Sequence, residues 1–162
     1  FNGLPTNKKL EILNEQNRVK KEDFEIIWNL KQKKTNEIIE KTASDDETKI
    51  RLHEGTSKFK KICVTNSIRQ TALLMLEKTG QLSFMEHVIS NEDVCNPKPD
   101  PEGYLKAIQY LQLQPNECMI VEDAPKGIEA AKKSNAHVYE VKGYHDVTLE
   151  NVLNTINHFN MN

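Results

Sequence analysis

The sequence has few cysteines, no long apolar run and no large excess of either charge. Its 162 residues contain 3 cysteines and a nearly balanced set of charges, with 22 Lys+Arg against 24 Asp+Glu and a net charge of -2. Surfaces that bind nucleic acid normally show a basic excess, so we expect no nucleic-acid partner. No apolar run approaches the length of a membrane span, and no signal peptide is recognisable. We therefore predict no membrane association and a cytoplasmic location.

The cysteines lack the paired spacing of zinc sites. Two of them, Cys63 and Cys118, lie within apolar runs, and the other is Cys95. We interpret them as buried thiols in a reducing compartment. The chain begins with Phe1 rather than Met, which is consistent with a fragment or a processed product.

Residues 1–54 show a helical pattern without strand signals. Apolar residues recur at helical spacing in a background rich in Lys and Glu, which predicts helices that pack through this stripe. The stripe comprises Leu10, Leu13, Phe24, Ile27, Trp28 and Ile38. The acidic run at 45–47 favours a solvated turn over a metal site.

From residue 61 onward, short apolar runs alternate with helical patterns. The runs at 62–64, 87–89, 118–121 and 138–141 are predicted strands, and helices are expected between them and over 146–159. Ser67 to Gln70 match a capping box, and Gly80 is a natural helix stop. This rhythm predicts an α/β fold with a Rossmann-like parallel sheet flanked by helices. Ligands bind such sheets at the carboxyl ends of the strands.

Three polar groups fall at such ends. The first strand is followed by Thr65, Asn66 and Ser67. A hydroxyl and free helix N–H groups at this position can bind a phosphate oxygen, and they can equally form a simple helix cap. Lys98 lies between two prolines that restrict its backbone, although a lone lysine in a loop is more often an ordinary surface residue. The third strand is followed by Glu122 and Asp123. These carboxylates can bind Mg²⁺, or they can be the negative charges that a helix N-terminus favours.

Taken together and in this order, the three groups resemble the haloacid dehalogenase superfamily, closest to its β-phosphoglucomutase-like branch with a helical cap. VTNS resembles the second motif, with Thr65 as the phosphate-binding hydroxyl. NPKPDPEGYLKA resembles the third, with Lys98 as the lysine that steadies phosphate. VEDAPKGIEAAKKSN resembles the fourth, with Glu122 and Asp123 at the magnesium.

The resemblance implies a partial cap over residues 1–54 and a partial α/β core over 55–162. It implies a Mg²⁺-dependent phosphatase or phosphomutase that acts on a small phosphorylated metabolite through an aspartyl-phosphate. In that chemistry Thr65 and Lys98 are catalytic, and Asn66 and Ser67 help to bind phosphate. GLP at 3–5 resembles part of a cap loop that faces substrate in relatives.

The family's first motif, an Asp-x-Asp-Gly stretch that carries the nucleophile, has no counterpart before residue 61. We therefore expect the N-terminal strand to be missing from these residues and the chain alone to be inactive. We also expect strand exchange or a missing N-terminal segment to complete the sheet. The alternative is a non-catalytic remnant that binds phosphate or a protein partner. A weaker alternative is a response-regulator-like signalling domain, which does not explain the helical first third.

Overall fold

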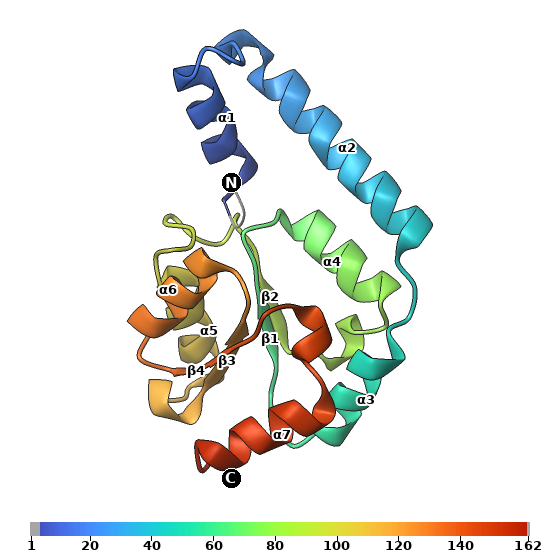
Figure 1. Cartoon of the computed structure of the whole chain (residues 1–162), viewed down its shortest axis with the longest axis vertical. Helices are drawn as coiled ribbons and strands as arrows, with labels where there is room; N and C mark the ends of the chain where they lie inside the picture. Colours follow the sequence, from blue (N-terminus) through green and yellow to red (C-terminus); the bar gives the residue numbers. More distant parts are fainter. Residues whose placement is uncertain (1–3, 162) are drawn as a thin grey trace.

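A computed structural model describes residues 4–161 of the chain (Figure 1). The described part consists of α-helices and short parallel strands, as the alternating pattern predicts. A helical hairpin stands above a layered α/β core (Figure 1). The elements are α1 (Thr6–Glu15), α2 (Phe24–Thr42), α3 (Glu47–Gly55), β1 (Ile62–Val64), α4 (Arg69–Lys78), β2 (His87–Ile89), α5 (Glu102–Leu111), β3 (Met119–Glu122), α6 (Pro125–Lys133), β4 (His137–Glu140) and α7 (Leu149–His158).

The hairpin is formed by α1 and α2, and α2 also contacts α4 of the core. Its buried apolar residues are Leu10 and Ile39, each 3% exposed. The prediction that Ile38 packs in the apolar stripe is wrong, because this side chain is 59% exposed. Helical spacing turns Ile39 inward instead, one residue further along the helix.

The core holds its strands in two parallel pairs. β1 pairs with β2 in the register Cys63↔Val88, and β3 pairs with β4 in the register Ile120↔Val138. The parallel pairing confirms the predicted class. Among the described residues β1 and β3 are not hydrogen-bonded to each other. Each therefore has one edge without a strand partner, and a pocket lies between them. Such a gap is what an absent N-terminal strand would leave, and that absence stays a prediction.

Helices cover the strand pairs through separate apolar clusters. Tyr104 of α5 packs with Ala130 and Ala131 of α6, and half-buried residues of β1, β3 and β4 join this cluster. On the opposite side, Leu52 of α3 packs against α7. The division between residues 54 and 55 stays a prediction, and α3, which spans it, lies against the core.

Three local predictions need correction. The capping box at Ser67 is not formed: α4 begins at Arg69, whose N–H donates to Glu92 Oε2 at 2.7 Å. This carboxylate from a distant loop takes the place of a local cap. Cys95 is exposed, so the interpretation of all the thiols as buried is wrong for that residue. The acidic run at 45–47 is not merely a solvated turn, because Asp46 caps α3 by accepting from Thr48 N and Lys49 N.

Candidate active site

A pocket of about 480 Å³ opens between the helical hairpin and the carboxyl ends of β1 and β3. Thr65, Asn66, Ser67, Lys98 and Glu122 all line it. The structure therefore brings together five of the six residues that the sequence placed in the site. The sixth, Asp123, is exposed and does not line the pocket. Of the GLP stretch, Gly3 lies outside the described residues, and Leu4 lines the pocket.

Lys98 is held at the edge of β1. Its Nζ donates to the Val64 carbonyl at 3.0 Å and to Glu122 Oε2 at 2.7 Å. The Asn66 side chain fixes the lysine's backbone, accepting from Lys98 N at 3.2 Å. The ammonium thus lies at the peptide group that leads from Val64 to Thr65, and it joins two strands that do not pair directly.

Glu122 ends β3 and is held by four donors. Oε2 accepts from Lys98 and from the Tyr104 hydroxyl at 2.6 Å, while Oε1 accepts from Asp123 N and Ala124 N at 3.2 Å. Burial by itself would raise the pKa of this carboxyl, but the Lys98 charge and these hydrogen bonds lower it overall. Glu122 is therefore ionised at neutral pH although its side chain is only 11% exposed.

Gly127 in the first turn of α6 lets the helix approach this carboxylate. A Cβ at Gly127 would overlap the carboxyl group of Glu122. The close approach explains why the sequence has glycine in a helix, where it is normally unfavourable.

The loop after β1 is closed by its own side chain. Thr65 Oγ1 accepts from Ser67 N at 3.1 Å, in a turn that precedes α4. In this arrangement the Ser67 N–H is used by Thr65 rather than directed at a ligand. The hydroxyl hydrogen of Thr65 can still donate into the pocket, because this bond uses only an oxygen lone pair.

A magnesium role for Glu122 and Asp123 stays a prediction. Among residues 4–161 there is no group of three or more His, Cys, Asp or Glu side chains that could hold a metal ion. The oxygens of Glu122 already accept four hydrogen bonds. Asp123 offers an exposed carboxylate, so these residues supply only part of a cation site.

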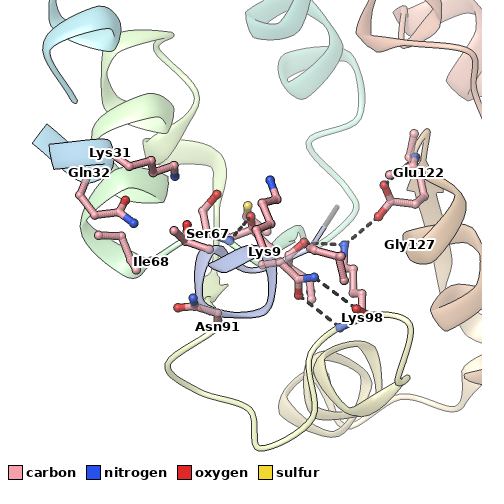
Figure 2. A pocket seen from close by; sticks show the side chains of 17 residues that line it. Lys9, Lys31, Gln32, Ser67, Ile68, Asn91, Lys98, Glu122 and Gly127 are labelled. Carbon is pink, nitrogen blue, oxygen red and sulfur yellow. Dashed lines mark hydrogen bonds and ion pairs between the residues drawn. The ribbon is translucent and has the colours of Figure 1, made fainter. Parts of the chain in front are cut away.

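The helical hairpin contributes Lys9, Lys31 and Gln32 to the opposite wall of the pocket (Figure 2). Partial burial and the nearby charge of Lys9 lower the pKa of Lys31. Two cations that face one cavity repel each other, and an anion between them relieves that repulsion. Sequence reasoning missed these residues because nothing in a Lys-rich helix marks which lysines face the core.

Tyr104 and Asn91 were also missed as site residues. Tyr104 lies in the stretch NPKPDPEGYLKA that resembles the third motif, but sequence reasoning assigned its side chain no role. Asn91 lines the pocket, and its buried Oδ1 has no hydrogen-bond partner among the described residues. No motif marks it.

A threonine and an acidic pair at the ends of parallel strands, with a lysine that reaches between them, form the arrangement that the motifs predict for an α/β protein. The profile of the haloacid dehalogenase-like hydrolase family matches residues 1–141, and the chain belongs to this family. The predicted family is thus confirmed, and the signalling-domain alternative is set aside.

Phosphatases are among the curated relatives. Validoxylamine A 7'-phosphate phosphatase of Streptomyces hygroscopicus is 37% identical over 83 residues, which are 51% of this chain and 39% of that protein. Hexitol phosphatase A of Escherichia coli is 35% identical over 81 residues, which are 50% of this chain and 38% of that protein. The chain thus spans about two fifths of the length of these relatives.

Solved structures share the fold. β-Phosphoglucomutase from Clostridium difficile superposes with a TM-score of 0.79 and 19% identity, covering 98% of this chain and 79% of that one. A hydrolase of the family from Entamoeba histolytica superposes with a TM-score of 0.72 and 19% identity, covering 90% and 77%. No described helix has the length and apolarity to cross a membrane.

Proposed function

We propose that this chain provides the phosphate-binding and charge-stabilising part of a phosphoric-monoester hydrolase that acts on a small phosphorylated metabolite. The observation that carries the proposal is the position of Lys98. Its ammonium is anchored at a strand end, beside Thr65, on the wall of a pocket large enough for a small ligand. The cations Lys9 and Lys31 across the pocket support an anionic substrate.

Each residue has a distinct task in this proposal. Lys98 neutralises charge on a phosphoryl oxygen, and Thr65 donates its hydroxyl to a second oxygen. Asn66 positions Lys98 through its backbone. The Ser67 N–H becomes available to phosphate only if Thr65 releases it.

Mg²⁺ would neutralise further charge on the phosphoryl group when bound. Asp123 is its best candidate ligand, with Glu122 beside it. Because so few protein oxygens are available, we expect Mg²⁺ to bind these residues weakly. Calorimetric titration of the chain should show this, and tight micromolar binding would contradict the incomplete site.

The nucleophile is the part that these residues do not supply. The sequence contains no Asp-x-Asp, and within residues 4–161 β1 and β3 each have one edge without a strand partner, on either side of the pocket. Val121, in the middle of β3, is 37% exposed, which is unusual in a parallel sheet. We propose that an additional strand, bearing the aspartates, pairs with β1 and β3. It would come from a further segment of the protein or from another chain.

Hydrolysis of p-nitrophenyl phosphate with Mg²⁺ tests the proposal. The 162 residues should be inactive, and the same chain extended by an Asp-x-Asp-Gly strand should hydrolyse the ester in a Lys98-dependent way. Lys98-dependent turnover by the unextended chain would show that the nucleophile lies within it. An extended chain that folds and binds phosphate but stays inactive would favour the non-catalytic alternative.

A further inference from the structure

Two donors meet at one oxygen of the site. Glu122 Oε2 accepts from Lys98 Nζ at 2.7 Å and from the Tyr104 hydroxyl at 2.6 Å. Tyr104 is 6% exposed and comes from α5, in the cluster that joins α5 and α6. Its hydroxyl therefore reaches Glu122 from the buried side of the site, where the ring packs in this apolar cluster.

The Tyr104 phenol donates one hydrogen bond within the site. Glu122 is the acceptor that the structure gives it.

Tyr104 also contacts the lysine. Lys98 Nζ lies 4.6 Å from the centroid of the Tyr104 ring, within the range of a cation–π interaction. The ammonium has three hydrogens, and the structure gives it two oxygen acceptors, the Val64 carbonyl and Glu122. One N–H remains for a ligand in the pocket that Lys98 lines.

We propose that Tyr104 is a positioning residue, whose hydroxyl and ring fix Glu122 and Lys98 so that the third N–H of Lys98 is directed at a bound phosphoryl oxygen. This inference rests on the proposed function, because it assumes that Lys98 binds phosphate. By sharing the negative charge on Oε2, the hydroxyl also weakens the hold of Glu122 on the lysine. Without it, Glu122 would attract Lys98 more strongly and would repel an incoming anion.

Tyr104→Phe removes the hydroxyl and keeps the ring. We expect inorganic phosphate, titrated calorimetrically into the full chain, to bind about tenfold more weakly, the lower end of the range for one hydrogen bond to a charged group. Tyr110→Phe is the matched control: Tyr110 is 52% exposed and stacks on His87, and its loss should leave phosphate affinity unchanged.

A tyrosine that only fills the core would lower stability without acting through Glu122. The double-mutant cycle with Glu122→Gln separates the two roles. If Tyr104 acts through Glu122, adding Tyr104→Phe to Glu122→Gln should change phosphate affinity less than twofold, about the additivity error of such cycles. An equal loss in both backgrounds, or unchanged phosphate affinity in Tyr104→Phe, would overturn the proposal.

Two further outcomes are decisive. Absence of phosphate binding by the wild type would refute the proposed anion site, and the role of Tyr104 with it. If Tyr104→Phe proves unfolded by circular dichroism, 3-fluorotyrosine provides the second test, because its more acidic phenol strengthens the same hydrogen bond. It should tighten phosphate binding in the wild type and not in Glu122→Gln; equal effects in both would refute the role.

Discussion

The ion pair between Lys98 and Glu122 is the most consequential contact outside the apolar clusters. Its atoms lie 2.7 Å apart, and the side chains are only 14% and 11% exposed. Breaking a buried pair by removing one partner typically costs about 3 to 5 kcal/mol, because the other charge is left uncompensated. Lys98→Met leaves Glu122 with the Tyr104 hydroxyl and two backbone N–H donors. We therefore expect the lower end, about 3 kcal/mol of unfolding free energy.

The double variant Lys98→Met/Glu122→Gln discriminates between a charge effect and lost packing. Removing both charges leaves no buried ion, so it should be no less stable than Lys98→Met alone. Urea unfolding, followed by Trp28 fluorescence and circular dichroism, measures each free energy. Lys133→Met, which breaks an exposed pair with Glu129, is the control and should change little. If the loss of unfolding free energy in the double variant equals the sum of the losses in Lys98→Met and Glu122→Gln, the reasoning is refuted.

Three further variants test other contacts. Gly127→Ala should lower the free energy of unfolding by about 1 to 3 kcal/mol, because the added Cβ overpacks against Glu122. The control Gly143→Ala should not lower it, because nothing lies within 4 Å of its added Cβ. Equal effects of the two variants would contradict the close approach. Burial raises the pKa of the Asp93 carboxyl, but its hydrogen bonds and ion pair outweigh burial and lower the pKa from 3.8 to about 2. The stability that this carboxylate contributes is therefore lost as pH falls from about 4 to 2. Asp93→Asn should lack this loss in acid unfolding. Burial lowers the pKa of His53 below 6.5, so stability should fall as pH drops through 6.5, and His53→Gln should flatten that slope; an unchanged slope would count against it.

The elements of the core could be predicted because their signals are local. Short apolar runs bounded by turns marked every strand to within a residue or two, and Gly80 marked the end of α4, where its φ of 70° favours glycine. The parallel pairing followed from the alternation of strands and helices. Which strands pair is set by tertiary packing, and so the separation into two pairs could not be read from the runs themselves.

The site was predicted through motifs, and its omissions have a common cause. Thr65 and Glu122 stand at strand ends, where position alone indicates a role, and Lys98 lies in a loop between two prolines. Tyr104 and Lys31 lie within amphipathic helices, where tyrosine and lysine are ordinary residues. Lys31 contributes because it lines the pocket, and Tyr104 because its hydroxyl reaches Glu122. Both depend on the direction of a side chain. That direction is fixed by contacts between elements far apart in the chain.

The acidic pair that ends β3 shows why adjacent residues of the same type need not share a task. Glu122 is the last residue of β3 and Asp123 is the first residue beyond it, and the two side chains meet different surroundings. Glu122 points inward, where four donors use its oxygens and Lys98 balances its charge. Asp123 is exposed, and none of the hydrogen bonds described for residues 4–161 uses its carboxylate.

Glu122→Gln should therefore affect the lysine and phosphate binding first, and Asp123→Asn should affect Mg²⁺ binding first. Calorimetric titrations of both variants with phosphate and with Mg²⁺ would show the division. Equal losses of both ligands in both variants would mean that the two acids act as one site.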